Sequence, residues 1–278
     1  MENILTNKVL CSDLIWRYLS ELTVGQKIIG FDENPNFDEY KAATRKYKEA
    51  TITQTKKEKS ILLKIKTENN FLIIPENNFV LVFVKNRKLK DLFLNQKNII
   101  FERKYPRSPG LIWKKAKDLT VNDELAFMTD PWAVETSKES GWLEGIFDGE
   151  GSLSRSTVKQ VRIPAWKINI SQNPGITYDR IKGEITQRNF TFYENIRACP
   201  QIVLTGGWSE TLRFLGSIRP ARLLLKLPLV VSNMPKLIQT RTYKNLKIQQ
   251  INNLGVQTYY DCITDSKTCI LNGFLCHC

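Results

Sequence analysis

Two acidic residues that alternate with glycines carry the most distinctive chemistry of the sequence. They are Asp148 and Glu150, and they lie near the end of the stretch WLEGIFDGEG at residues 142–151. In a helix, both acids would lie at the C-terminal end, where the helix dipole already contributes partial negative charge. Acids are unfavourable there unless a positive group binds. A divalent metal ion would supply that charge, so the pattern indicates a cation beside these carboxylates.

An amphipathic helix has to position these acids. Thr136 and Glu139 have the spacing of a capping box, which predicts a helix with Thr136 as its N-cap. Gly145 and Gly149 lie four residues apart on one helix face, where they permit close contact with another helix. Gly151 is expected to end the helix. The apolar face, at spacings i, i+3 and i+4, consists of Leu143, Ile146 and Phe147.

The charge of the chain indicates what it binds. The 278 residues are enough for two domains that each bury a core. Among them, 41 basic and 28 acidic residues give a net charge of +13. Such an excess favours a polyanionic partner, with nucleic acid first and an acidic membrane surface second. The alternative is a soluble protein without such a partner, encoded by a genome whose base composition favours lysine.

The sequence shows no secretion signal and no membrane span. Its first ten residues lack a basic segment followed by an apolar one, and the apolar run at residues 223–231 is short and interrupted by Lys226 and Pro228. We therefore expect an intracellular, cytoplasmic protein with reduced thiols and no membrane partner. Four of the six cysteines lie in the last 17 residues, but without C-x2-C pairs we expect no zinc site there.

The first third of the chain is expected to consist of strands and turns. Residues 32–59 are polar without a clear period, which predicts a surface excursion. Asn-Asn pairs then join strands in two hairpins, and the strands are residues 60–66, 71–74 and 79–84. Residues 111–125 repeat the pattern of residues 14–29: a tryptophan, then basic residues, then Leu-Thr-Val before a turn. This weak repeat suggests two related β-lobes.

A different pattern begins near residue 136. Helical and strand periods follow each other in the order α-β-β-α-β-β-α up to residue 227, and short strands return in the tail. We therefore expect an α+β fold, in which a central module is flanked by two halves of a β-rich domain. The expected boundaries of the three parts are residues 1–134, 135–235 and 236–278.

The residues of the central module resemble a known family. LEGIFDGEG at residues 143–151 is similar to the nine-residue signature of the LAGLIDADG homing endonucleases, whose repeat unit has the αββαββα order. The flanks are similar to the Hint (intein-like) fold, at residues 9–13, 22–25 and 260–277. A single signature implies a homodimer. The dimer contact that the resemblance implies comprises Leu143, Gly145, Ile146 and Gly149.

The resemblance implies a site-specific homing endonuclease that hydrolyses phosphodiester bonds on both strands of double-stranded DNA with Mg²⁺ as cofactor. Glu150 aligns with the family's metal-binding acid, and the carbonyl of Gly149 is the further metal ligand. Gln172 matches the residue that orders the nucleophilic water. Lys226 matches the basic residue near the phosphate, with two arginines nearby. Asp148 is expected to order the turn rather than bind metal.

The resemblance also implies that a four-stranded sheet binds the major groove of DNA as a curved saddle. Period-two alternation assigns Trp166, Ile168 and Ile170 to the core face, so the side chains between them point outward. Asn, Gln, Arg and Lys predominate among the outward residues, and they suit both base edges and phosphates. The predicted DNA-binding residues are Lys159, Gln160, Arg162, Lys167, Asn169, Ser171, Tyr193, Asn195 and Arg197.

Protein splicing is the main alternative activity, and its residues can be compared one by one. Inteins begin with a Cys or Ser nucleophile, where this chain has Met1-Glu2. They carry Thr-x-x-His where this chain has residues 74–77, IPEN, and they end in His-Asn where it has His277-Cys278. These differences favour a degenerate Hint-like scaffold around an endonuclease. An intein that still splices and a non-catalytic DNA-binding relative remain alternatives.

Overall fold

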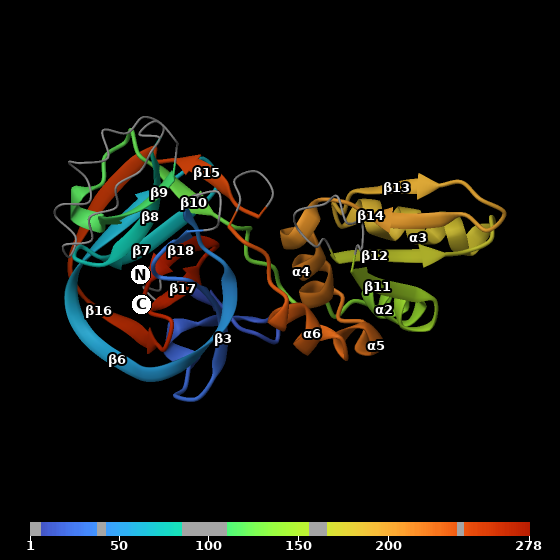
Figure 1. Cartoon of the computed structure of the whole chain (residues 1–278), viewed down its shortest axis with the longest axis horizontal. Coiled ribbons are helices and arrows are strands. Elements are labelled where there is room, and N and C mark those ends of the chain that lie inside the picture. Colours follow the sequence, from blue (N-terminus) through green and yellow to red (C-terminus); the bar gives the residue numbers. More distant parts are fainter. Residues whose placement is uncertain (1–6, 38–42, 85–109, 156–165, 238–241) are drawn as a thin grey trace.

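A computed structural model describes residues 7–37, 43–84, 110–155, 166–237 and 242–278. Figure 1 shows two bodies side by side: a β-rich one and a smaller one of helices and strands. We call the first the β body, comprising β1 to β10 and β15 to β18. The second is the α/β module, from α2 to α6.

The main sheet of the β body has eight strands from both flanks of the α/β module. Its order is β15-β10-β8-β18-β17-β1-β2, and β9 pairs with β8. The bounds are β1 Lys8–Leu10, β2 Trp16–Tyr18, β8 Phe79–Val84, β9 Gly110–Lys115, β10 Glu124–Phe127, β15 Lys244–Lys247, β17 Thr268–Leu271 and β18 Phe274–His277. The two flanks therefore fold as one unit, and the chain leaves it at Phe127 and returns at Lys244, which is the β-sheet partner of Phe127.

A second sheet curves around the first (Figure 1). It contains β3 Lys27–Phe31, β6 Tyr47–Lys66, β7 Phe71–Pro75 and β16 Gln250–Thr264, while β4 Asn36–Phe37 and β5 Ala43–Thr44 form a separate pair. The surface excursion predicted at residues 32–59 is wrong, because β6 begins at Tyr47. The first predicted hairpin, β6 with β7, is confirmed. The second is not, because β7 and β8 belong to different sheets.

The weak sequence repeat is confirmed as a repeat of structure. Each copy has a strand, a short 3-10 helix, a turn and a second strand: β2, η1 Leu19–Glu21 and β3 in one, β9, η2 Ala116–Asp118 and β10 in the other. The residue before each 3-10 helix has nearly the same backbone angles, φ −65° and ψ 147° at Tyr18 and φ −66° and ψ 145° at Lys115. Leu22 and Leu119 are both buried after it.

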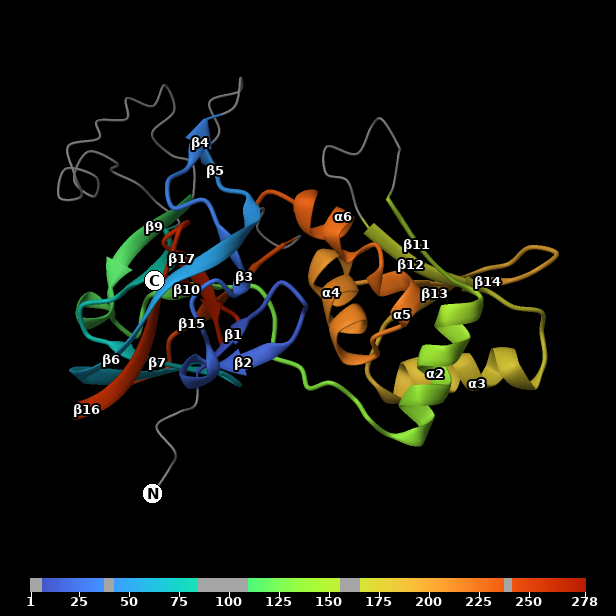
Figure 2. The same ribbon diagram turned by 90° about the horizontal axis from the view of Figure 1, so that it is seen from below.

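The α/β module has the predicted order α-β-β-α-β-β-α, with its last helical part divided into three. The bounds are α2 Lys138–Gly149, β11 Gly151–Arg155, β12 Trp166–Ser171, α3 Ile176–Gln187, β13 Phe192–Asn195, β14 Gln201–Leu204, α4 Gly207–Ser217, α5 Ala221–Leu224 and α6 Leu227–Ser232. Its sheet has the order β11-β12-β14-β13. Helices α2, α3 and α4 cover one face of this sheet, and no described helix or strand covers the other, which we call the open face (Figure 2).

A shared hydrophobic cluster joins the α/β module to the β body. Trp132 packs edge-to-face on Trp16 with 5.5 Å between ring centroids, and its Nε1 donates to the carbonyl of Leu14 at 3.0 Å. Gly216 of α4 lies so close that an added Cβ would be 2.2 Å from Trp132 Nε1. Arg219 Nη1 also donates to the carbonyl of Asp13 at 3.0 Å. The two bodies are therefore packed together rather than connected only by the chain, and we call their contact the joint.

Two further predictions concern the environment of the chain. A disulfide joins Cys269 to Cys278, so the expectation of reduced thiols is wrong for these two residues. Among the residues that the structure describes, no helix is long and apolar enough to cross a membrane.

Candidate metal centre and nucleic-acid interface

Helix α2 begins one residue later than predicted. Ser137 is the N-cap, and its Oγ accepts the backbone N–H of Ser140 at 3.1 Å, so the predicted Thr136 cap is wrong. Leu143 and Phe147 are fully buried in the core of the chain. Leu143 therefore presents no surface to a second copy, which corrects its assignment to the dimer contact. Ile146 is half-buried against the same core.

The glycines of α2 face open space in the single chain. A Cβ added at Gly141, Gly145 or Gly149 would meet no atom within 4 Å. These three glycines follow each other at intervals of four and therefore form one stripe along the helix. The close contact that the glycines were predicted to allow is absent within the described part of one chain. A partner molecule has room to approach this stripe closely.

An arginine supplies the positive charge that the sequence indicated at the end of α2. The guanidinium of Arg222, from α5, donates to the backbone carbonyls of Asp148 and Gly149, the latter at 3.2 Å from Nη2. The same Nη2 donates to the carbonyl of Gly151. In return, Asp148 Oδ1 accepts the backbone N–H of Arg222 at 2.7 Å, so Asp148 orders the turn as expected. Arg222 thus compensates the helix dipole without a metal ion.

Lys226, the predicted basic residue near the phosphate, binds the edge strand of the sheet. Its Nζ donates to the carbonyl of Leu153 at 3.0 Å. Arg222 and Lys226 lie four residues apart, and their acceptors Gly151 and Leu153 lie two apart on edge strand β11. One turn of helix spans nearly the same length as two residues of strand, so the two spacings match. Both cations therefore satisfy carbonyls that an edge strand leaves unpaired.

Glu150 follows the helix as its C-cap residue, and its carboxylate is exposed. Among the described residues, none forms a hydrogen bond or ion pair with this carboxylate. Gln172 lies at the same end of the sheet, because Gly151 pairs with Ile170 two residues before it. The backbone N–H of Gln172 donates to the carbonyl of Pro200 at 3.1 Å, which fixes this corner. The fold therefore places the predicted acid and the predicted water-ordering amide at one corner of the module.

The donor set at this corner is small for a metal ion. Among the residues that the structure describes, no group of three or more His, Cys, Asp or Glu side chains is placed to hold one. The carbonyl of Gly149 already accepts from Arg222, which leaves it one lone-pair direction. Mg²⁺ nevertheless often binds through one or two carboxylates, with water and substrate phosphates as its other ligands. A free carboxylate at Glu150 fits that mode of binding.

The open face of the module's sheet carries polar side chains, as predicted. Trp166, Ile168 and Ile170 are buried, so Lys167, Asn169 and Ser171 point to the other side. Across the sheet, Ser171 pairs with Gln201, and Gln201 pairs with Asn195. Tyr193 is 47% exposed on the same face. This polar surface forms a continuous row across three strands, next to the corner that holds Glu150 and Gln172.

Two other predictions for this face have different outcomes. Arg197 donates to the side-chain oxygen of Asn195 when the Asn195 amide is turned to face it. The distances are 3.1 Å from Nε and 3.0 Å from Nη2. Ile196, which follows the last residue of β13, is 86% exposed, so the alternation of buried residues does not continue past Asn195. The predicted contacts Lys159, Gln160 and Arg162 lie outside the described residues.

Sequence reasoning missed Gln201 and undervalued Arg222. Gln201 directly precedes the buried Ile202, so strand alternation would have assigned its side chain to the open face. The four-residue spacing of Arg222 and Lys226 was visible, but the carbonyls they bind lie more than 70 residues away in sequence. A spacing within one segment does not reveal a partner in another.

In the β body, Glu33, Lys267 and His277 form a second cluster of ionisable side chains. His277 Nε2 lies 3.2 Å from Glu33 Oε1, and Lys267 Nζ lies 3.4 Å from Glu33 Oε2. Burial alone would raise the pKa of Glu33, but these two partners lower it below its ordinary value. The Cys11 thiol is buried, and this burial raises its pKa. The thiol is consequently a poor nucleophile near neutral pH.

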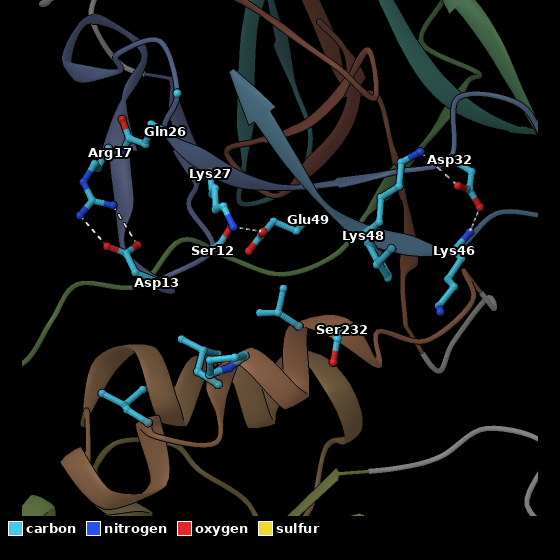
Figure 3. A pocket seen from close by; sticks show the side chains of 16 residues that line it. Ser12, Asp13, Arg17, Gln26, Lys27, Asp32, Lys46, Lys48, Glu49 and Ser232 are labelled. Carbon is cyan, nitrogen blue, oxygen red and sulfur yellow. Dashed lines mark hydrogen bonds and ion pairs between the residues drawn. The ribbon is translucent and has the colours of Figure 1, made fainter. Parts of the chain in front are cut away.

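A cavity of about 1090 Å³ lies between the β body and helices α5 and α6 (Figure 3). One wall is apolar, from Leu224 to Val231. The other wall is charged but largely paired: Lys27 with Glu49 at 2.7 Å, Lys48 with Asp32 at 3.4 Å and Arg17 with Asp13 at 2.6 Å. Paired charges offer little net attraction to a polyanion. None of the predicted catalytic or DNA-binding residues lines this cavity.

Comparisons with known proteins give little beyond this geometry. No model of a protein family matches the chain. No curated protein matches it. Among solved structures it is similar to the crystal structure of the G-1F mutant of the Ssp DnaB mini-intein variant M86, with a TM-score of 0.38 and 9% sequence identity over 98% of this chain and 94% of that chain. A similarity at this TM-score carries no conclusion about function.

Proposed function

We propose that the protein is a site-specific homing endonuclease of the LAGLIDADG type that hydrolyses both strands of double-stranded DNA, with Mg²⁺, as a homodimer. The observation that carries this proposal is the Glu150 carboxylate. It is exposed and free of partners among the described residues, and it lies where α2 meets a sheet with an open polar face. The net charge of +13 suits a polyanionic substrate.

Glu150 would hold the metal ion together with water and a phosphate oxygen of the substrate. Bound Mg²⁺ supplies charge neutralisation on the phosphate and an activated water. Gln172, at the same corner, would orient that water through its amide. Lys226 stays a candidate for a phosphate contact, although its hydrogen bond to Leu153 favours a role in holding β11. Arg222 keeps the helix end in place without occupying the Glu150 carboxylate.

The homodimer would form through the glycine stripe of α2. Two copies of α2 in contact there would bring two Glu150 carboxylates together, one for each DNA strand. The open space at Gly145 and Gly149 supports this contact, because small residues let helix backbones approach closely. With Leu143 buried, the proposed contact consists of Gly145, Gly149 and the half-buried Ile146.

Glu150→Gln tests the proposal directly. It removes the charge that binds metal while it keeps the shape of the side chain. We expect DNA cutting to fall at least about 100-fold, as expected for a lost metal ligand, while the melting temperature and DNA affinity stay near those of the unchanged protein. The measurement is cleavage of a randomised duplex library with Mg²⁺, beside an EDTA control. Glu139→Gln, an exposed acid in the first turn of the same helix, is the matched control and should cut normally.

The results of this assay separate the candidates. Binding without cutting by the unchanged protein would sink the endonuclease proposal and favour a non-catalytic DNA-binding relative. Loss of both folding and binding in Glu150→Gln would mean that Glu150 is structural. Normal cutting by Glu150→Gln would remove it from the site.

A second candidate function is protein splicing by an intein-type element. The observation that favours it is the meeting of the two flanks: β1 pairs with β17, and Asn272 Oδ1 accepts the N–H of Lys8 at 2.7 Å. The buried thiol of Cys11 and the contact of His277 with Glu33 give it no support. Mass spectrometry of the chain fused between two reporter domains tests it. A joined reporter product would establish splicing, and intact fusion protein would exclude it.

A further inference from the structure

Two amides on the open face of the module's sheet hold each other in one orientation. Gln201 Nε2 donates to Asn169 Oδ1 at 3.0 Å and to Ser171 Oγ at 3.5 Å. Gln201 belongs to β14, and its neighbours in register are Ser171 of β12 and Asn195 of β13. The amide pair therefore lies at the middle of the polar row, on strands whose other face is packed in the core.

The pair leaves an acceptor on Gln201 and a donor on Asn169, two side chains in contact on this face. One N–H of Gln201 Nε2 binds Asn169 Oδ1 at 3.0 Å and the other has only a long contact of 3.5 Å with Ser171 Oγ, so Oε1 is the acceptor that Gln201 offers to a ligand. Asn169 Oδ1 is occupied, and Asn169 Nδ2 keeps its N–H donors. Neither Gln201 Oε1 nor Asn169 Nδ2 has a hydrogen-bond partner in the described part of the chain. Both residues are half-buried, which limits their rotation.

We propose that the Asn169–Gln201 pair recognises an adenine in the major groove of DNA. Adenine presents N7 as an acceptor beside the N6 amino group as a donor, which is the complement of this pair. Asn169 Nδ2 would donate to N7, and the N6 amino group would donate to Gln201 Oε1. Guanine presents two acceptors, N7 and O6, so its O6 would face Gln201 Oε1 without a proton between them. This inference rests on the DNA binding in the proposed function.

The position of the pair also indicates where the adenine lies in the target. Gln201 follows Pro200, whose carbonyl accepts the backbone N–H of Gln172. Gln172 and Glu150 are the proposed catalytic residues at that corner. The adenine that the pair reads is therefore expected close to the bond that is cut, rather than at the outer end of the target.

Selection from a randomised duplex library tests the inference without cutting. The full chain is incubated with the library in EDTA, and bound duplexes are sequenced. We expect adenine enriched at one position of each half-site. Gln201→Ala should lower that preference about 10-fold, within the range for a bidentate base contact, and leave the other positions unchanged. Asn169→Ala should relax the same position, and the double variant should add little to either single one.

A matched control and a folding check keep the result interpretable. Gln187→Ala changes an exposed glutamine at the end of α3, on the side of the sheet that the helices cover, and it should leave the whole selected sequence unchanged. The melting temperature of each variant shows whether it is folded. A conservative Gln201→Asn variant, too short to reach both partners, should lose the preference while it stays folded.

The outcomes separate this inference from the proposed function. A selected site that Gln201→Ala leaves unchanged, or one with a G·C pair enriched at the affected position, would overturn the inference alone. Selection of a site without cutting in Mg²⁺ would remove the endonuclease activity and leave base reading intact. Absence of any DNA binding by the unchanged protein would overturn both.

Discussion

Two glycines of the β body, Gly30 and Gly273, and the glycines of helix α2 meet opposite surroundings. A Cβ added at Gly273 would be 2.0 Å from the carbonyl of Thr129, and one added at Gly30 would be 2.7 Å from Ser266 Oγ. At Gly145 and Gly149 the same atom would meet nothing within 4 Å. At Gly30 and Gly273, packing within one chain requires glycine. In α2 the single chain gives no reason for it, so the reason is expected in another molecule.

Polar side chains of the two regions also differ in whether they have hydrogen-bond partners within the chain. In the β body, Thr268 Oγ1 donates to the carbonyl of Phe31, and the buried amide of Asn272 binds Asn7 at 3.2 Å. Such groups are satisfied inside the chain. On the open face of the module, Asn169 and Gln201 retain free donors and acceptors, and Glu150 has no partner among the described residues. These groups of the β body therefore serve packing within the chain, whereas those on the open face of the module are available for binding.

The contact between the two regions has the largest expected effect on stability. Trp132→Ala removes a nearly buried ring from the joint, and we expect the free energy of unfolding to fall by about 3–5 kcal/mol. Thermal unfolding should then show the module and the β body melting separately. Trp113→Ala, in the repeat copy remote from the module, is the control and should leave one transition. An unchanged curve for Trp132→Ala would mean that the regions are independent.

Gly145→Leu tests the open stripe of α2. Because the position has room and leucine favours helix, the single chain should be stabilised by up to about 1 kcal/mol. The same side chain would block close pairing of two helices, so dimer formation and double-strand cutting should be lost. Sedimentation and plasmid cleavage measure these effects. Gly183→Leu, at an equally open glycine of α3, should keep both, and a dimer that tolerates Gly145→Leu would place the interface elsewhere.

Asp13 at the joint gives the smallest expected effect, and it depends on pH. Burial would raise the pKa of Asp13, but hydrogen bonds from Arg17 and the N–H of Ile15 lower it below its ordinary value. A lowered pKa in the folded state stabilises the protein above about pH 4, and that contribution is lost as the pH falls through the folded pKa. Asp13→Asn should cost less than about 1 kcal/mol at pH 7, because the pair is half exposed.

Urea unfolding at pH 7 and pH 3 checks this expectation. The difference between the unchanged protein and Asp13→Asn should narrow as the pH falls below about 4, because the unfolded chain then binds a proton at Asp13 that the folded state binds less readily. Glu139→Gln, exposed and remote from the joint, provides the control. A difference that stays constant with pH would mean that the carboxylate charge plays no part in the joint.

The sequence allowed prediction of those elements whose residues alternate between buried and exposed. In β12, Trp166, Ile168 and Ile170 are buried as period two requires, and the order of elements in the module followed from such patterns. The first part of β6 escaped prediction because residues 53–59 are exposed on both faces, so no alternation marks them. Only pairing with β16, about 200 residues later, makes this segment a strand.

The charge at the end of α2 shows a second limit of sequence reasoning. Asp148 and Glu150 indicated a nearby cation, and the structure provides Arg222, 74 residues after Asp148. A helix end attracts any positive group, so composition alone does not distinguish an arginine from a metal ion. The free carboxylate of Glu150 is what leaves a role for metal. Its freedom depends on tertiary neighbours, which no local spacing reveals.

The return of the chain beside its point of departure has a consequence for folding. Because Phe127 and Lys244 face each other in adjacent strands, the whole α/β module is the loop of one β-hairpin. Closing a disordered loop of that length before any contact forms carries a large entropic cost, which grows with the logarithm of its length. A module that folds first brings its own ends together and shortens the loop. We therefore expect the inserted module to fold before the main sheet of the β body is completed.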